Sequence, residues 1–378
     1  MRVLFLTCHL PYPPHSGGRL REHELLSRLT QRFPVHVVAV TKTLAEDEEA
    51  AGEIPWEHDG ISLFPAAQLA ALDGRAPQVA RHRSERASAG LHARLASGRF
   101  DMLHVEGFYL WPHVARRRRP SSLLVEQNIE WQLYEQRGLA AEARATRRAE
   151  LAAWRQADAL GALTTEDRGV MHAYTGRAVD LIPDGADHLA ELEAPAAARS
   201  GRQLLMVGNF GYEPNVDGAI WLVDEVLPRI RALVPDAQLQ LVGASPPPEI
   251  EALRSAGVEV SGRVPDVRPY LERADVVLCP LRFGGGVKVK TLEALAAGRA
   301  TVSTEVGCQG LGSAGAALAV ENSAERFAAA AAELLMDPVA RMRAEAAAAA
   351  VRLPCWDDAA EVLAECWARA GRESLAAA

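Results

Sequence analysis

Residues 279–298 read CPLRFGGGVKVKTLEALAAG, and they join a strand end, a glycine turn and a helix start that carries two lysines. The apolar run Ala274–Pro280 predicts a buried strand, and Lys288–Ala297 has the composition of a helix. The three residues Gly284, Gly285 and Gly286 remove side chains from the turn between them. This order of elements predicts an α/β fold with a ligand site at the turn.

The chemistry of the turn favours an anion. A helix start offers backbone N–H groups and the positive end of a dipole, so we expect a phosphate there with Lys288 or Lys290 beside it. Glu293, one turn into the helix, would repel a bare phosphate but would accept hydrogen bonds from sugar hydroxyls. The combination favours a nucleoside diphosphate that carries sugars. Glycine turns also occur in α/β proteins for steric reasons alone, and that interpretation stays open.

Length and composition restrict the class of protein. The chain has 378 residues, which favours two domains, and 49 % hydrophobic with 24 % charged residues is typical of a globular protein. The net charge of −8 argues against a general nucleic-acid binder. We find neither a membrane span nor a signal peptide, so we expect a cytoplasmic protein, and the excess of Ala and Arg suggests a bacterial genome. Five scattered cysteines lack metal-ligand spacing, and we expect most of them to be buried free thiols.

Apolar strand patterns alternate with helical patterns in both halves, which predicts two doubly wound parallel sheets. In the first half we expect strands at Arg2–Thr7, Val35–Thr41, Met102–Val105, Leu123–Glu126, Ala159–Leu163 and Ala178–Ile182. In the second half we expect them at Gln203–Val207, Gln238–Val242, Val258–Val260, Val276–Cys279, Ala300–Ser303 and Ala317–Val320.

The boundary between the domains is predicted at the turn Ile182–Gly185 and the strandless stretch Glu191–Arg202. We therefore assign residues 1–185 to a first domain and residues 186–355 to a second. Residues 356–378 form an amphipathic helix that we expect to return to the first domain. Trp356 and Trp367 lie eleven residues apart on one face of that helix, so we expect them to pack rather than to stack on a sugar.

Several motifs resemble one enzyme family. Residues 204–215 (LLMVGNFGYEPN), 262–267 (GRVPDV) and 280–298 are similar to the donor domain of family 4 glycosyltransferases. Residues 1–7, the proline-rich turn and the glycine pair after it resemble the acceptor domain of that family. Pro183-Asp184-Gly185 stands where the family has a Pro-Asn-Gly crossover. The resemblance covers almost the whole chain.

The resemblance implies a GT-B fold, with two Rossmann-like domains facing a cleft. It also implies a retaining hexosyltransferase that uses a nucleotide-diphosphate sugar as substrate, and from the resemblance we expect neither a metal nor a cofactor. Lys288 and Lys290 would then stabilise the diphosphate leaving group, and Glu293 would bind the donor ribose. Arg263 and Val264 match the segment that borders the nucleobase, and Gly208 and Asn209 match the turn that flanks the phosphates. The acceptor, whether a small molecule, a glycan or a lipid-linked sugar, is not specified, and neither are the donor base and sugar or the oligomeric state.

Three positions depart from the family pattern. Gly285 replaces the first glutamate of a paired motif, and Asn209 replaces an arginine. Gln127, in the segment Val125–Glu130, stands where the family has a histidine, and a glutamine hydrogen-bonds but does not shuttle a proton. A nucleotide-sugar epimerase or hydrolase on the same fold, or a noncatalytic GT-B partner protein, therefore stays open as an alternative.

The remaining candidates lie at strand ends in the first domain, where doubly wound sheets bind ligands. Gly17 and Gly18 are predicted between the first strand and the first helix, close to phosphate or acceptor. Glu106 and Glu126 follow buried strands and could orient the acceptor hydroxyl, with a helix-capping or solvated carboxylate as the alternative. His9, His15 and His104 occupy comparable places, where a structural role is the commoner one. The run Arg116–Arg119 is more typical of a solvated helix end than of peripheral membrane contact.

Overall fold

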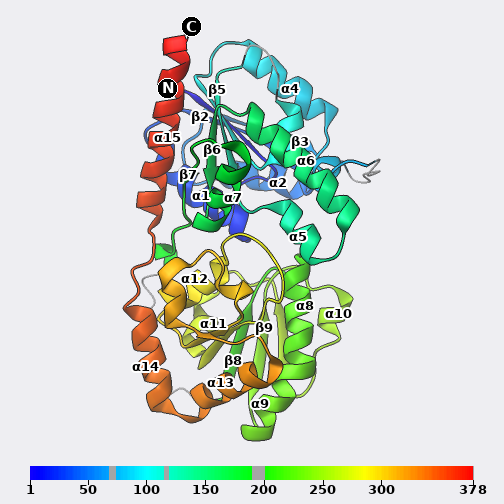
Figure 1. Ribbon diagram of the computed structural model, residues 1–378, viewed down its shortest axis with the longest axis vertical. Helices are drawn as coiled ribbons and strands as arrows, with labels where there is room; N and C mark the ends of the chain where they lie inside the picture. Colours follow the sequence, from blue (N-terminus) through cyan, green and yellow to red (C-terminus); the bar gives the residue numbers. More distant parts are fainter. Residues whose placement is uncertain (68–73, 115–118, 190–200, 378) are drawn as a thin grey trace. The chain divides into compact units, whose positions relative to one another are not determined.

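The protein forms two compact units in a computed structural model that describes residues 1–67, 74–114, 119–189 and 201–377 (Figure 1). Side chains are described up to residue 371. Unit 1 comprises Met1–Gly185 with Trp356–Ala378, and unit 2 comprises Ala186–Cys355. Most of the predicted linker stretch, and residues 116–118 of the arginine run, lie outside the described residues.

Unit 1 is built on a parallel sheet in the order β3-β2-β1-β4-β5-β6-β7. Its strands are β1 (Val3–Thr7), β2 (Val35–Thr41), β3 (Gly60–Pro65), β4 (Met102–Glu106), β5 (Ser121–Glu126), β6 (Ala159–Ala162) and β7 (Asp180–Leu181). In register, Val3 pairs with Val35 of β2 and with Met102 of β4. All five residues of β1 are buried because helices cover both faces of a parallel sheet.

The described helices of unit 1 connect these strands. They are α1 (Gly17–Leu29), α2 (Leu44–Ala50), α3 (Pro77–Arg81), α4 (Glu85–Ala96), α5 (Glu130–Gln136), α6 (Ala140–Gln156), α7 (Thr165–Thr175) and α15 (Trp356–Ala377), with the short 3-10 helices η1 (Ala51–Glu53) and η2 (Phe108–His113). Several starts are fixed by polar caps: the side chains of Ser16, Ser84 and Thr164 accept backbone N–H bonds from α1, α4 and α7.

Unit 2 repeats the architecture with the strand order β10-β9-β8-β11-β12-β13, all parallel. Its strands are β8 (Gln203–Val207), β9 (Gln238–Val242), β10 (Val258–Gly262), β11 (Val276–Cys279), β12 (Thr301–Ser303) and β13 (Ala319–Val320). Its described helices are η3 (Asp187–Leu189), α8 (Glu213–Trp221), the π-helical turn η4 (Leu222–Val226), α9 (Leu227–Leu233), α10 (Pro248–Glu251), α11 (Arg268–Arg273), α12 (Val289–Ala296), η5 (Val306–Cys308), η6 (Gly312–Ala317), α13 (Ala324–Met336) and α14 (Pro338–Ala349).

Helix α15 belongs to unit 1 although it ends the chain, which confirms the predicted return (Figure 1). It packs beside α1, and Trp356 and Trp367 are both fully buried. The ring of Trp367 meets Phe33 edge to face at 5.7 Å, and its indole N–H donates to His104 Nδ1 at 3.1 Å. Two buried tryptophans remove a large apolar area from water, so the helix is a constituent of the core of unit 1.

The predicted strands are confirmed in both units, and one strand was missed. β3 has the sequence GISLFP, in which Ile61 and Leu63 are flanked by a glycine and a proline. It lies at the sheet edge and pairs only with β2, so it lacks the continuous apolar run of a central strand.

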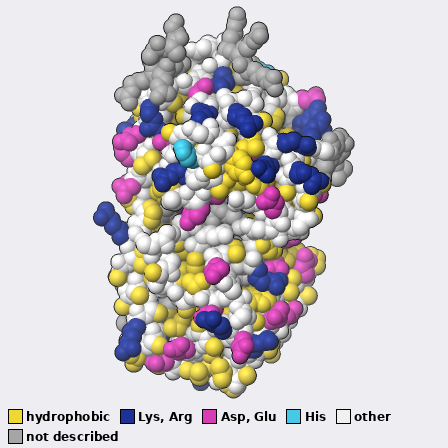
Figure 2. Space-filling model, viewed as in Figure 1, with side chains coloured by type: hydrophobic (Ala, Val, Ile, Leu, Met, Phe, Trp, Pro, Cys, Tyr) yellow, Lys and Arg dark blue, Asp and Glu magenta, His cyan; other side chains and the backbone are white. Residues whose placement is uncertain are grey.

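Within the described residues, no helix is both long and apolar enough to cross a bilayer. On the face that Figure 2 shows, Lys and Arg side chains alternate with Asp and Glu side chains over both units. Neither sign of charge is gathered into one patch on that face.

Candidate functional site

The two sheets reverse their strand order at a defined place, between β1 and β4 in unit 1 and between β8 and β11 in unit 2. Ligands of doubly wound proteins bind outside the carboxyl ends of the strands at such a switch point. The loops that follow β1, β4, β8 and β11 are therefore the places where a site is expected, and the sequence-predicted residues can be followed there.

In unit 2 the turn after β11 contains two backbone positions that glycine adopts without strain and other residues do not. Gly284 and Gly286 have positive φ angles of 141° and 67°. The ammonium of Lys288 is buried beneath the turn, where it donates to the carbonyl oxygens of Gly285 (2.8 Å) and Gly286 (2.9 Å). Lys288 therefore holds the turn together in this structure, a role that the sequence did not predict.

Lys290 lies on the first turn of α12, and its ammonium donates to the side-chain oxygen of Asn215 on α8. Asn215 in turn donates to the backbone oxygen of Asn209 at 2.7 Å. Burial lowers the pKa of Lys290, because the ammonium loses water without a full set of charged partners. The structure thus brings Asn209 and Lys290 together through Asn215, which the sequence reasoning had not selected.

The loop after β8 closely approaches the neighbouring strand. A side chain at position 208 would crowd its neighbour, because a Cβ on Gly208 would lie 3.0 Å from the Asn215 amide. A Cβ on Gly243 would lie 1.7 Å from the carbonyl oxygen of Gly208. These two glycines set the backbone of the loop that carries Asn209.

Glu293 projects from α12 and its Oε1 lies 3.2 Å from His188 Nε2 of η3. Arg263 is exposed just beyond β10, and Val264 packs against the apolar cluster that includes Leu271. β10 is separated from β8 by β9, a distance of about 10 Å across the sheet. Lys290 and Glu293 therefore share one helix, whereas Arg263 lies further along the sheet edge.

In unit 1 one local prediction is corrected. Gly17 and Gly18 do not lie in the loop between β1 and the first helix; they are the first two residues of α1. Ser16 caps that helix, and its hydroxyl accepts from the backbone N–H of Arg19. Gly18 is nevertheless placed at the site, since a Cβ on it would lie 3.2 Å from both Gln127 Oε1 and His9 Cε1.

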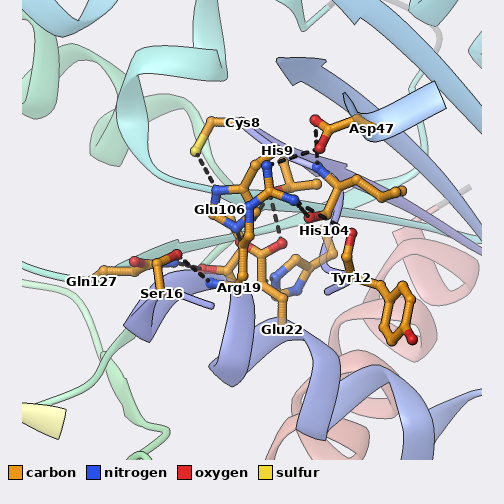
Figure 3. Close-up of polar contacts among 12 residues, drawn as sticks. Cys8, His9, Tyr12, Ser16, Arg19, Glu22, Asp47, His104, Glu106 and Gln127 are labelled. Atoms are coloured by element: carbon orange, nitrogen blue, oxygen red, sulfur yellow. Dashed lines mark hydrogen bonds and ion pairs between the residues drawn. The ribbon is translucent and has the colours of Figure 1, made fainter. Parts of the chain in front are cut away.

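Glu106 and Gln127 form part of a buried hydrogen-bond chain (Figure 3). The indole N–H of Trp367 can only donate, so His104 Nδ1 accepts and the ring carries its proton on Nε2. That Nε2 lies 2.9 Å from Glu106 Oε1, and the Gln127 amide donates to Glu106 Oε2 at 3.2 Å. Although burial opposes it, hydrogen bonds from His104 and Gln127 hold the pKa of Glu106 below its usual value. Glu106 thus orients Gln127, and Trp367 of α15 anchors the chain.

A second chain runs beside it, from the end of β1 to α1 (Figure 3). The Thr7 hydroxyl lies 2.7 Å from Glu22 Oε2, and His9 Nε2 lies 3.2 Å from Glu22 Oε1. His9 Nδ1 is 3.2 Å from the sulfur of Cys8, and the Tyr109 hydroxyl donates to the same sulfur at 3.4 Å. Burial raises the pKa of Glu22 to about 7.

Glu126 lies in the core rather than at the loop, at 2 % exposure. Its Oε1 accepts from the Trp154 indole at 2.8 Å and its Oε2 from the Phe108 backbone N–H at 3.2 Å. Burial raises its pKa to about 8. Glu126 therefore supports η2 and α6, and it presents no oxygen to a ligand in this structure.

A cavity of about 260 Å³ adjoins Tyr109. Its lining combines basic, acidic, hydroxyl and apolar side chains from α3, α4, η2 and the residues next to α3 and α4: Arg75, Val79, Arg83, Ser84, Glu85, Ser88, Tyr109, Pro112 and His113. Gly107, with a φ of 91°, lets the Tyr109 ring fold back, because a Cβ there would lie 2.5 Å from that ring. Among the described residues, no group of three or more His, Cys, Asp or Glu side chains is placed to hold a metal ion.

Sequence reasoning missed Cys8, Glu22, Asn215 and Tyr109, and it favoured a structural role for His9. Cys8 and His9 directly follow β1 at the switch point, so their position was a usable signal. Glu22 and Asn215 lie inside helices, where only the packing shows which way they point.

Comparison with known proteins agrees with this geometry. Residues 201–337 match the family model described as glycosyl transferases group 1. No match was found among curated protein sequences.

Three solved structures are similar over almost their full lengths. WaaG, a glycosyltransferase involved in lipopolysaccharide biosynthesis, is 17 % identical with a TM-score of 0.70, covering 95 % of this chain and 99 % of that one. Alr3699/HepE from Anabaena, in complex with UDP and glucose, is 14 % identical with a TM-score of 0.71, covering 97 % and 98 %. The alpha,alpha-trehalose 6-phosphate synthase from Burkholderia multivorans is 13 % identical with a TM-score of 0.66, covering 100 % and 99 %.

Identities this low establish similarity of fold only. The predicted fold class is confirmed: both units are parallel α/β domains, and α15 packs on unit 1. The chain therefore has the GT-B fold, and the match of residues 201–337 to group 1 glycosyl transferases supports a glycosyltransferase.

Proposed function

We propose that the protein is a retaining hexosyltransferase that moves a sugar from a nucleotide-diphosphate sugar to an acceptor hydroxyl without a metal ion. Unit 2 would bind the donor and unit 1 the acceptor. The observation that carries the proposal is the start of α12, where the desolvated ammonium of Lys290 and, one turn later, the carboxylate of Glu293 project from one helix.

The donor half of the proposal follows from charge. A diphosphate at the glycine turn would meet the backbone N–H groups at the start of α12 and the ammonium of Lys290. Lys290 would neutralise charge on the leaving diphosphate, a task that a bound cation performs in other transferases. Lys288 would act indirectly, since its ammonium already binds Gly285 and Gly286. Glu293 would accept from ribose hydroxyls while sharing His188.

The acceptor half follows from the hydrogen-bond chains of unit 1. Glu106 fixes the Gln127 amide by accepting from its nitrogen, which leaves the amide oxygen beside Gly18 to accept from a hydroxyl. In the reaction, the acceptor oxygen would attack the anomeric carbon on the face from which the diphosphate leaves. The departing phosphate oxygen would take the acceptor proton, so Gln127 need only orient the acceptor.

Binding and turnover of nucleotide sugars test the proposal. The purified chain is incubated with UDP-, GDP-, ADP- and dTDP-hexoses, and its melting temperature is measured, because a ligand stabilises the folded state by RT ln(1 + [L]/Kd). The donor that stabilises the chain is then offered to a panel of sugar, glycan and lipid-linked acceptors with and without EDTA. NMR of the product reports the anomeric configuration.

We expect one nucleotide to stabilise the chain and the product to keep the donor configuration in EDTA. A chain that no nucleotide sugar stabilises contradicts the proposal. Hydrolysis or a new sugar isomer without acceptor would support the epimerase or hydrolase alternative. Binding without turnover under any acceptor would support a noncatalytic partner, for which Gly285, Asn209 and Gln127 are the motivating departures.

A further inference from the structure

Cys8, His9 and Glu22 lie in a continuous chain of contacts that the proposed transfer does not use (Figure 3). His9 Nδ1 is 3.2 Å from the Cys8 sulfur, and His9 Nε2 is 3.2 Å from Glu22 Oε1. The Thr7 hydroxyl fixes the carboxylate from the other side at 2.9 Å and 2.7 Å. A nucleophile, a base and a group that orients the base thus contact one another in sequence, which is the arrangement by which proteins activate cysteine thiols.

The contacts are those of a thiolate. His9 Nδ1 lies within hydrogen-bond distance of the sulfur, and His9 Nε2 makes an ion-pair contact with the Glu22 carboxylate without the alignment of a hydrogen bond; the two contacts together favour the doubly protonated ring. The Tyr109 hydroxyl donates to the sulfur from a third direction, at 3.4 Å. A sulfur that receives hydrogen bonds from an imidazolium and a phenol is stabilised in its ionised form.

Two further basic side chains favour the ionised form of Cys8, while the acidic groups Glu22 and Glu130 also act electrostatically on this cluster. His82 is stacked on the Tyr109 ring at 4.6 Å and favours the ionised sulfur, and Lys42 at the end of β2 acts on the sulfur electrostatically. Burial alone raises the pKa of Cys8, but His9 and His82 outweigh it and lower the pKa well below its usual value. Burial likewise opposes charging of His9, and the Glu22 carboxylate with Cys8 reverses this and raises the pKa of His9.

Cys8 is also distinguished from the other cysteines by its surroundings. It is half-buried, as are Cys308 and Cys355, whereas Cys279 and Cys366 are buried. Burial raises the pKa of Cys308 and raises that of Cys366 to about 12. The cavity of about 260 Å³ is lined in part by Tyr109, whose hydroxyl contacts Cys8.

We propose that Cys8, His9 and Glu22 form a nucleophilic triad, and that Cys8 is a site of covalent modification by hydrogen peroxide and other small electrophiles. With peroxide, the thiolate attacks one oxygen, an S–O bond forms and the O–O bond breaks. Hydroxide leaves with the bonding electron pair and takes the proton of His9 Nδ1. Sulfur is oxidised to a sulfenic acid, and the peroxide is reduced to water and sulfenate oxygen. The proposal is independent of the proposed transferase activity.

Alkylation of the full chain measures the thiolate directly. The protein is pulsed with iodoacetamide from pH 5.5 to 9, and mass spectrometry of peptides gives the rate at each cysteine. At pH 6.5 a thiol of ordinary pKa is about 1 % ionised. A thiol of lower pKa is more fully ionised, but its thiolate is a weaker nucleophile, so its alkylation rate rises by less than its ionised fraction does. We expect Cys8 to react about tenfold faster than Cys308 in the same sample at pH 6.5.

Two variants identify the cause. In His9→Asn the cation is lost, so the rate at Cys8 is expected to fall about tenfold at pH 6.5 and to rise with pH as an ordinary thiol does. Glu22→Gln is expected to give a smaller fall. Cys308→Ser is the matched control and leaves the Cys8 profile unchanged. Peroxide followed by dimedone is expected to label Cys8 in the wild type and not in His9→Asn.

Equal rates at Cys8 and Cys308 in the wild type would overturn the proposal, and this comparison needs no variant to fold. An unlabelled Cys8 would also overturn it. A His9→Asn protein that keeps the wild-type urea midpoint and the wild-type pH profile would remove His9 from the triad.

Discussion

Replacing Lys290 with methionine tests the diphosphate assignment at its centre. Methionine keeps most of the apolar stem and removes the charge, so the packing of α12 is largely preserved. The ammonium is buried, its pKa is lowered by that burial, and Asn215 is its neutral partner. A phosphate would add a counter-charge to which the ammonium can donate directly, beside the electrostatic effect of Glu293. A hydrogen bond to a charged group contributes about 1.5–3 kcal/mol, which corresponds to about 10- to 150-fold in affinity or rate.

Calorimetry with the nucleoside diphosphate and steady-state kinetics with the donor check this prediction. We expect Lys290→Met to weaken diphosphate binding and lower kcat/KM within that range, while binding of the nucleoside without phosphates is unchanged. Lys288→Met is the matched control: its ammonium binds Gly285 and Gly286, so its loss is expected to lower the urea midpoint by loosening the turn. Unchanged diphosphate binding and turnover in a folded Lys290→Met protein would refute the reasoning.

The remaining predictions concern stability. Glu126 holds its proton up to about pH 8 in the folded chain but only to about pH 4.5 in the unfolded chain. Its contribution to the unfolding free energy therefore falls by up to about 1.4 kcal/mol per pH unit as the pH rises between those values. Urea titrations at several pH values should show that the unfolding free energy of Glu126→Gln falls less steeply with pH than that of the wild type. Trp367→Phe leaves His104 Nδ1 without its donor and is expected to cost about 1–3 kcal/mol; an unchanged midpoint would contradict the anchoring role. Gly243→Ala places a Cβ 1.7 Å from a carbonyl oxygen, so we expect unit 2 not to fold, which circular dichroism would detect. Gly262→Ala is the control: the space around it is open, so only its positive φ is strained, and the unfolding free energy is expected to fall by about 1 kcal/mol.

The sequence predicted the sheets because the central strands are buried on both faces and therefore appear as continuous apolar runs. β2, β8, β9 and β11 begin and end at the predicted residues. β3 was missed because an edge strand needs no such run. The start of α1 was misplaced by the glycine pair, which suggested a loop, although the Ser16 cap fixes the helix start before Gly17.

The candidate site was predicted in part. The glycine turn, Lys290 and Glu293 were found because a phosphate-binding turn is local in sequence. Asn215 could not be found, since its contact with Lys290 spans 75 residues. The carboxylates of the first half were selected together, and only burial separates Glu126, which is enclosed in the core, from Glu106, which orients Gln127.

The amino-acid sequence by itself determined the parallel α/β architecture in two halves, the return of the last helix and the cationic glycine turn. Each of these depends on residues that are neighbours along the chain or share one helical face. The tertiary structure alone decided that Lys288 holds its own turn while Lys290 faces Asn215, and that Cys8, His9 and Glu22 meet in one line. The physical reason is that hydrogen-bond geometry and desolvation depend on how a helix is rotated against its sheet, and residue order does not specify that rotation.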